Sequence, residues 1–252
     1  MLLFPKKKKI ILHSPKTGGT FIKSLFNNTN ECKIYSGKIS YAKNEYELSH
    51  LTLNEIKKFG IKTAIKKDFK IYCFARNVKD RVNSSIHECL RQNLLDINVK
   101  GFYNTDDITN ALNKLINLLE KQNQNNWENY DRKLIHFKPQ IFYIKESHKI
   151  LNYNLIKDTE NLSKLFQENF EVEITKKMLK QKKIYPSKIP YTSNNLLNFV
   201  FRKNSKKNYV TYRILNYSLK KKIDFSILFK KEFDKIYSFY KEDRKLLFEL
   251  KD

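Results

Sequence analysis

One short stretch constrains the fold more than any other part of the chain, because residues 8–26 join three local patterns in a fixed order. An apolar run at residues 10–12 is broken by Ser14 and Pro15, and apolar residues then return at helical spacing in residues 21–26. The run and its break are typical of a strand that ends in a turn, and the returning pattern is typical of a helix. This stretch therefore predicts a strand, a tight turn and a helix in direct succession.

The turn has the residue types of an anion-binding loop. Gly18 and Gly19 lack a Cβ, so their backbone amides can approach an anion closely. The helix that begins near Thr20 directs its unpaired N–H groups and its positive dipole end toward the same place, and Lys16 and Thr17 add further donors. The stretch predicts a cradle for phosphate or sulfate; the alternative is that the glycines only reverse the chain.

A second junction of strand and helix follows later in the chain. Residues 69–75 form a β-branched and aromatic run typical of a buried strand, and residues 78–92 carry apolar residues at helical spacing. Arg76 stands at the strand end and Ser84 about two turns into the helix, a spacing that suits one dianionic group. In a parallel sheet both junctions fall at carboxyl ends of strands, where ligands bind. The alternatives are a salt bridge from Arg76 to Asp80 and an ordinary helix serine.

The remaining patterns alternate between helix and strand. We expect further helices over residues 51–60, 106–122, 158–170 and 225–250, strands within 136–144 and over 153–157, a loop over 27–40, and a basic surface loop over 176–193. This alternation predicts one domain over residues 1–252 with an α/β fold. We expect a three-layer, P-loop-like arrangement in which helices flank a central, mainly parallel sheet.

Composition adds weaker constraints. The hydrophobic content of 40% and aromatic content of 13% exclude a disordered chain. A net charge of +24 favours an anionic partner, but enrichment in Lys, Asn and Ile is typical of any protein from an AT-rich genome, so the charge carries little weight as evidence of function. We expect no nucleic-acid partner. The odd number and the spacing of Cys32, Cys73 and Cys89 argue against a disulfide framework. No apolar stretch is long enough for a signal peptide or a membrane span, and we expect a cytoplasmic protein.

The loop sequence resembles that of a known family. Residues 15–20 read Pro-Lys-Thr-Gly-Gly-Thr, whereas a Walker A loop places its lysine after the last glycine. This order after a first strand resembles the 5′-phosphosulfate loop of the PAPS-dependent sulfotransferases, most nearly the carbohydrate branch that includes the heparan and chondroitin enzymes. The resemblance implies that the 5′-phosphosulfate is held by Lys16, Thr17, Gly18, Gly19 and Thr20. It also implies that Arg76 and Ser84 hold the 3′-phosphate, although the family usually has Asp-Pro after that arginine and this chain has Asn77-Val78.

The resemblance also implies catalytic and acceptor-side residues. His50 lies in a segment similar to the one in which glycan 2-O-sulfotransferases carry a His-x-His base, and Leu48 stands at the first position of the pair. Lys16 would neutralise the oxygen that leaves with the nucleotide. His136 and Gln140 lie in His-Phe-Lys-Pro-Gln, which resembles a family element near the acceptor, with a packing or capping role as the alternative.

The function implied by this resemblance is transfer of a sulfuryl group from PAPS to a hydroxyl of a glycan or glycolipid, with in-line attack, a histidine base and release of PAP. No metal is expected to take part. Many eukaryotic relatives in this family are anchored by a transmembrane helix, so the resemblance also implies a version of microbial or viral origin. Two alternatives remain open at this point: a small-molecule kinase on a P-loop-like fold, and a non-catalytic protein that binds polyanions or nucleic acid on the same fold.

Overall fold

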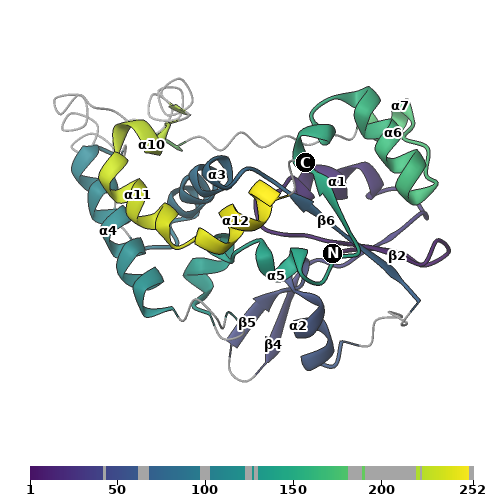
Figure 1. The fold of residues 1–252 in the computed structure, drawn as a ribbon, viewed down its shortest axis with the longest axis horizontal. Coiled ribbons are helices and arrows are strands. Elements are labelled where there is room, and N and C mark those ends of the chain that lie inside the picture. The colour runs from purple at the N-terminus through teal and green to yellow at the C-terminus, as the bar shows by residue number, and fades with distance from the viewer. Residues whose placement is uncertain are drawn as a thin grey trace, which may run out of the picture. The chain divides into compact units, whose positions relative to one another are not determined.

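The computed structural model describes residues 1–41, 44–61, 68–96, 103–122, 127, 130–180, 189–190, 220–221 and 223–249. The chain divides into two compact units (Figure 1). The first comprises Met1–Arg81, Trp127–Tyr185 and Glu242–Asp252, and the second comprises Val82–Asn126 and Pro186–Lys241. A single domain over residues 1–252 stays a prediction.

A five-stranded mixed sheet with the order β3-β1-β2-β6-β7 lies at the centre of the first unit. Its strands are β1 (Leu2–Phe4), β2 (Lys9–Leu12), β3 (Lys33–Ile34), β6 (Lys70–Ala75) and β7 (Lys149–Asn152). Strands β2, β6 and β7 are parallel, whereas β1 pairs antiparallel with both β2 and β3. The sheet is therefore mixed rather than mainly parallel as predicted. The sequence did not reveal the antiparallel strands β1 and β3, because they are too short to give a periodic pattern.

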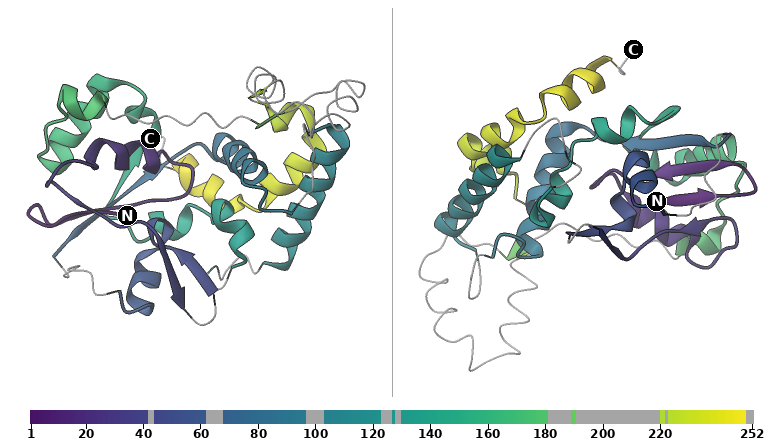
Figure 2. Two further views of the ribbon diagram at one scale, coloured as in Figure 1. Left: turned by 180° about the vertical axis from the view of Figure 1, so that it is seen from behind. Right: turned by 90° about the horizontal axis from the view of Figure 1, so that it is seen from below.

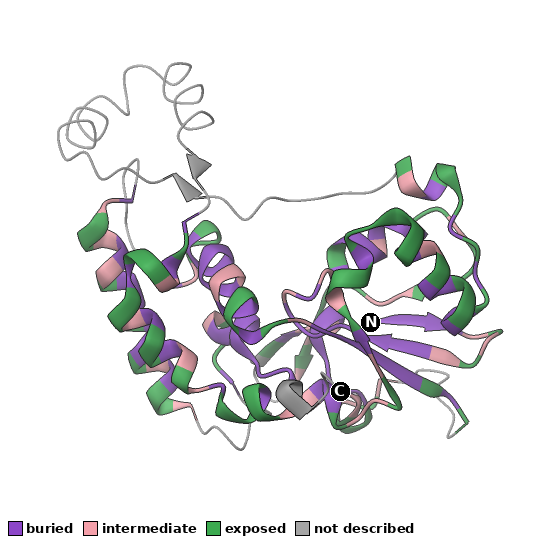
Figure 3. Cartoon of the chain, turned by 45° about the horizontal axis from the view of Figure 1, so that its top comes forward, coloured by how far each residue is buried: buried purple, intermediate pink, exposed green. Residues whose placement is uncertain are grey.

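Helices pack on the sheet, and α1 (Gly19–Phe26), α6 (Thr159–Phe170) and α7 (Lys176–Lys180) share one hydrophobic core with it. In this core, Phe4 of β1 contacts Phe26 of α1 and Phe170 of α6, with ring centroids 5.4 and 5.0 Å apart. Figure 1 shows α2 (Leu53–Lys58) and α5 (Ile141–Ile144) on the opposite side of the strands, and α5 packs against β6. Figure 3 shows that β1, β2 and β6 are buried over most of their length. The predicted α/β fold with flanking helices is thus confirmed, and a P-loop-like fold stays a prediction.

Short apolar runs account for the elements that were predicted wrongly. Residues 153–157 form the 3₁₀ helix η3 (Tyr153–Ile156) instead of a strand, because the strand at this place is the preceding β7. Residues 136–144 form the end of the 3₁₀ helix η2 (Arg132–Phe137) and then α5, with no strand. Runs of about four apolar residues fit strand and helix equally well.

The predicted loops also contain regular structure. Within residues 27–40 lie β3 and most of β4 (Lys38–Tyr41), which forms an antiparallel hairpin with β5 (Asn44–Glu47). The predicted basic loop over 176–193 begins with α7 and includes β8 (Ile189–Pro190), while residues 181–188 and 191–193 lie outside the described residues.

The second unit is largely helical. It contains most of α3 (Val78–Arg91), together with α4 (Thr105–Lys121), α10 (Phe225–Leu228), α11 (Lys230–Ser238) and the short β8 and β9 (Lys220–Lys221). Helix α4 lies beside α11 in both views of Figure 2. The buried apolar residues of the second unit include Val82, Ile86, Leu90, Ile108, Leu112, Leu115, Phe233 and Ile236. The single helix predicted over 225–250 is instead α10, α11 and α12 (Lys241–Glu249), and the side chains of its predicted apolar residues Leu247 and Phe248 are not described.

The three cysteines are free and buried, and burial raises the pKa of each of these thiols to about 12. Within the ranges that the structure describes, none of the helices has the length and apolar character needed to cross a membrane.

Candidate anion-binding site

The two predicted anion-binding elements meet at one edge of the central sheet. Strands β2 and β6 are parallel neighbours, with Leu12 opposite Cys73. Strand β2 continues through residues 13–18 into α1, and β6 continues through Arg76 into α3. The carboxyl ends of both strands, and the residues that follow them, therefore lie at the same edge.

The loop after β2 has a backbone that requires its glycines. Gly18 has a φ of 83°, in the left-handed region, and a Cβ added there would lie 2.4 Å from Cδ1 of Ile156. A Cβ added at Gly19 would lie 2.0 Å from Nε2 of His13. Lys16 also adopts a left-handed conformation, with a φ of 65°. Packing against His13 and Ile156, together with backbone conformation, excludes larger residues from this turn.

Polar groups in the loop are partly used by the loop itself. The buried hydroxyl of Thr17 donates a 2.7 Å hydrogen bond to the carbonyl of Ser14, which closes the turn. The Oγ of Ser14 is buried and has no hydrogen-bond partner among the described residues. Lys16 is half-buried and Thr20 is exposed. Since buried polar groups are rarely left unsatisfied, Ser14 offers a free group to a ligand in this loop.

Arg76 lies against the loop. Its Nη1 donates a 3.1 Å hydrogen bond to the carbonyl of Lys16, and its guanidinium carbon lies 4.7 Å from the ring centroid of Tyr153. Its Nε has no hydrogen-bond partner among the described residues. Burial lowers the pKa of Arg76, and a bound anion would oppose that shift. Lys16 and Arg76 are thus brought together, and within the described residues Arg76 makes no ion pair with Asp80.

Ser84 lies in α3 and belongs to the second unit, where it is half-buried. The resemblance placed it on the 3′-phosphate beside Arg76, and that role stays a prediction.

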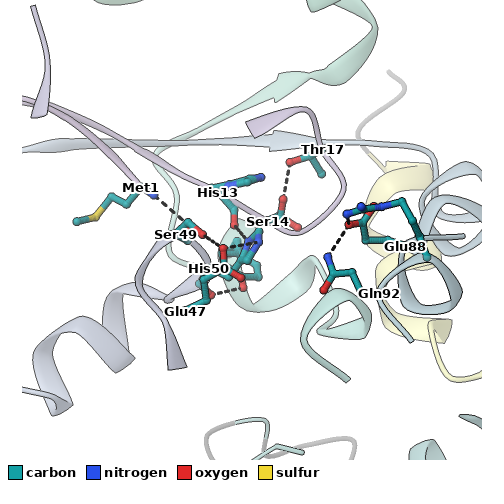
Figure 4. A network of polar contacts seen from close by, with 11 residues as sticks. Met1, His13, Ser14, Thr17, Glu47, Ser49, His50, Glu88 and Gln92 are labelled. Carbon is teal, nitrogen blue, oxygen red and sulfur yellow. Dashed lines mark hydrogen bonds and ion pairs between the residues drawn. The ribbon is translucent and has the colours of Figure 1, made fainter. Parts of the chain in front are cut away.

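His50 ends the 3₁₀ helix η1 (Leu48–His50) and lies beside the start of the loop (Figure 4). Its Nδ1 is 3.2 Å from the carbonyl oxygen of His13. A carbonyl can only accept, so Nδ1 carries the proton and Nε2 keeps its lone pair. Tyr143 donates a 2.6 Å hydrogen bond to the His50 carbonyl and so holds the backbone as well.

The surroundings keep the His50 ring neutral. Burial, with a smaller contribution from the cationic Lys23 and Lys16, lowers its pKa to about 3, so the ring is neutral at pH 7. Its Nε2 lies 3.9 Å from Oε1 of Glu47, and this oxygen also accepts a 2.6 Å hydrogen bond from Ser49. The ring therefore has the protonation state and the tautomer that a general base at Nε2 requires.

A cavity of about 250 Å³, lined in part by Glu47, was not predicted from the sequence. Its lining residues come from the β4–β5 hairpin and from η2: Gly37, Lys38, Glu45, Tyr46, Glu47, Arg132 and Ile135. Glu45 pairs with Lys38 and Arg132 at 3.1 and 2.9 Å, while Glu47 reaches toward His50. Most of β4 falls in the loop predicted over residues 27–40, no structure was predicted for β5, and the sequence carries no signal that pairs this hairpin with η2.

The two residues expected near the acceptor occupy different surroundings. His136 is buried in η2, with its ring centroid 6.1 Å from that of His50. Gln140 instead binds the backbone of Arg76 with both ends of its side-chain amide. Gln140 thus contacts the strand end at Arg76, whereas His136 lies near the candidate base, and a role of either residue near the acceptor stays a prediction.

The remaining histidines have structural contacts away from the loop. His87 lies 2.8 Å from the carbonyl of Ile223 in the second unit. His148 accepts a hydrogen bond at Nδ1 from the backbone N–H of Ile71, at 3.0 Å. Of the five histidines, His13, His50 and His136 are the ones gathered near the candidate site.

Acidic and metal-ligating side chains are not clustered at this edge: in the described ranges, no group of three or more His, Cys, Asp or Glu residues is placed to hold a metal ion. Comparison with known proteins adds no relative to this picture, since no family model, no curated protein and no solved structure matches the chain.

Proposed function

We propose that this protein is a PAPS-dependent sulfotransferase that acts on a hydroxyl of a glycan or glycolipid. One observation carries the proposal: the Arg76 guanidinium donates to the carbonyl of Lys16 where the parallel strands β2 and β6 end side by side. A glycine turn with a lysine and an arginine at a neighbouring strand end can bind the two anionic groups of one nucleotide.

The residues at this edge fit a nucleotide that carries two anionic groups. The unpartnered Oγ of Ser14 and Nε of Arg76 are buried donors at the loop. The turn around Gly18 precedes α1, whose first backbone N–H groups have no partner within the helix. Lys16 and Arg76 supply the positive charge.

The bound donor supplies an activated sulfuryl group, whose sulfur–oxygen bond to the 5′-phosphate breaks as the acceptor oxygen bonds to sulfur. In our proposal Lys16 stabilises the charge that develops on the leaving oxygen. Nε2 of His50 accepts the proton of the acceptor hydroxyl, while the His13 carbonyl holds Nδ1–H in place. Glu47, 3.9 Å from Nε2, stabilises the imidazolium that this transfer creates.

We assign the acceptor to the cavity between the β4–β5 hairpin and η2. Glu47 lines the cavity and lies 3.9 Å from Nε2 of His50, and in our proposal the acceptor hydroxyl extends from the cavity toward this nitrogen. Charged side chains and Tyr46 line it, and such groups suit the hydroxyls and the apolar face of a sugar.

Isothermal titration calorimetry with PAP tests the donor side. We expect the wild type to bind and Arg76→Ala to bind at least about tenfold more weakly, because a charge-assisted hydrogen bond is lost. Arg91→Ala is the matched control, since Arg91 pairs with Glu88 in α3 and touches neither strand end. Absence of PAP binding by the wild type, or equal binding by Arg76→Ala, would overturn the proposal.

The reaction itself is tested with radiolabelled PAPS and a panel of glycans, lipids and small alcohols. Transfer of label by the wild type and its loss in His50→Gln are expected. Magnesium-dependent ATP binding without PAP affinity would instead favour the kinase.

A further inference from the structure

Gln140 makes an unusually complete contact with the backbone of Arg76. Its Oε1 accepts from the Arg76 N–H and its Nε2 donates to the Arg76 carbonyl, both at 2.9 Å. Gln140 is itself fully buried and directly precedes α5. One side-chain amide therefore satisfies both backbone polar groups of the arginine at the strand end.

The C-terminal helix α12 holds Gln140 through Asp243. The carboxylate accepts 2.9 Å hydrogen bonds from the backbone N–H groups of Gln140 and Ile141, and so caps α5. Its Oδ2 also lies 3.4 Å from Nη2 of Arg81, and neither side chain is exposed. A buried charge pair with these extra hydrogen bonds is sensitive to small displacements of any member.

The same set of contacts extends to the helix that follows His50. Arg81 donates a 3.1 Å hydrogen bond to the carbonyl of Lys138. Nζ of Lys138 binds Oε1 of Glu55 at 2.6 Å, again with both side chains buried. Glu55 belongs to the capping box of α2 with Thr52, two residues after His50. A buried polar network thus runs from Arg76 to the segment of the candidate base.

We propose that Gln140 is a positioning residue for Arg76, and that Asp243 of α12 holds Gln140 in place, so that the C-terminal helix sets the geometry of the donor site. The guanidinium donates to the Lys16 carbonyl, and the direction in which the side chain leaves the strand end depends on the orientation of the Arg76 backbone. Gln140 fixes that orientation because it supplies a donor and an acceptor at once. The inference deepens the proposed function, and its binding test rests on that function.

The chemistry of the amide dictates the variants. Gln140→Met keeps the approximate size of the side chain and removes both hydrogen bonds. Gln140→Glu keeps the acceptor, and its ionised carboxylate cannot donate to the Arg76 carbonyl. A protonated glutamic acid regains the donor. Gln167→Glu is the matched control, because Gln167 is exposed on α6 and the substitution changes the net charge equally.

PAP affinity is measured by calorimetry from pH 8 to pH 5, and each dissociation constant is divided by that of the wild type at the same pH. We expect Gln140→Met to bind about tenfold more weakly at every pH. Gln140→Glu should be as weak at pH 8 and should recover toward pH 5, while Gln167→Glu stays at the wild-type value. The neutral Met variant separates lost positioning from charge repulsion. Wild-type affinity in Gln140→Met overturns the inference.

A second measurement needs no nucleotide. The Arg76 N–H donates to Gln140, so its hydrogen exchange in Gln140→Met should be at least about tenfold faster by NMR, while amides inside β6 keep their protection. Unchanged exchange at Arg76 overturns the inference whatever the PAP result. Faster exchange in a protein that binds no PAP would leave the positioning role standing and would reject the sulfotransferase alone.

Discussion

The two junctions of strand and helix at the edge of the sheet are built in different ways. The turn after β2 is shaped mainly by neighbours in sequence: Gly19 leaves room for the His13 ring, and the Thr17 hydroxyl binds the Ser14 carbonyl, while Gly18 leaves room for the distant Ile156. The junction after β6 is shaped from a distance, because Gln140 binds the backbone of Arg76 across 64 positions of the chain. Asp243 in turn binds Gln140 across 103 positions.

This difference separates what each junction can tolerate. A turn made of glycines fails when atoms are added, because there is no space for them. A junction held by buried polar contacts fails when atoms are removed, because their partners then remain buried and unsatisfied. Substitutions that add atoms to the turn after β2, and substitutions that remove polar atoms at the junction after β6, therefore test this contrast directly.

The largest effect is expected from Asp243→Ala, because Asp243 holds Gln140 and so supports the junction after β6. Removal of the carboxylate leaves Arg81 as a buried charge and strips two backbone N–H groups of their acceptor, so we expect a loss of about 3–5 kcal/mol in the free energy of unfolding. Urea denaturation followed by circular dichroism measures it. Glu242→Ala, at an exposed neighbour 3.9 Å from Lys145, should stay within about 1 kcal/mol of wild type. Equal losses of stability in both variants would contradict the conclusion that buried contacts from distant residues hold the junction after β6.

The next largest effect is expected from Gly19→Ala in the turn after β2. We expect a loss of about 3 kcal/mol in the free energy of unfolding, because the new methyl group overlaps the buried His13 ring. A double-mutant cycle with His13→Ala should show favourable coupling, since removal of the ring makes the space. Gly37→Ala is the comparison: an added Cβ meets nothing within 4 Å there, and only its φ of 98° opposes the change. Additive effects of Gly19→Ala and His13→Ala would mean that the glycine serves another purpose.

The smallest effect is a pH dependence that comes from His50. Its folded-state pKa of about 3 lies below the ordinary value of 6.5, so below pH 6.5 the unfolded chain binds more protons than the folded protein. Stability therefore falls as the solution is acidified, by about 2 kcal/mol between pH 7 and pH 5 from this ring. In His50→Gln the amide can still donate to the His13 carbonyl, and the slope should decrease. Parallel curves for the two proteins would show that His50 does not titrate in this way.

Local signals carried most of the correct predictions. Apolar spacing identified α1, α2, α3, α4 and α6 and the strands β2 and β6. Both junctions could be predicted because a strand end and a helix start are close together in sequence, with a glycine turn between them at the first junction. The adjacency of the two strand ends followed from the expected parallel pairing, which holds for β2, β6 and β7.

The features that escaped prediction depend on distant partners or on very short elements. Strand β1 has three residues and pairs with two others, so no periodicity marks it. The cavity lined by Glu47 forms where the β4–β5 hairpin lies against η2, two segments that are far apart in the sequence. The roles of Gln140 and Asp243 are set by the backbone groups they bind, and the sequence does not show which backbone groups a distant side chain will contact.

The buried thiols described above make local opening of the molecule measurable without an introduced probe. A thiol reagent attacks the thiolate, and burial with a pKa of about 12 withholds that form until the surrounding structure separates. Cys73 reports on β6 beside Arg76, and Cys89 reports on α3 in the second unit. Labelling rates at these two positions, followed together by mass spectrometry, therefore distinguish opening at the donor edge of the sheet from opening of the helical unit.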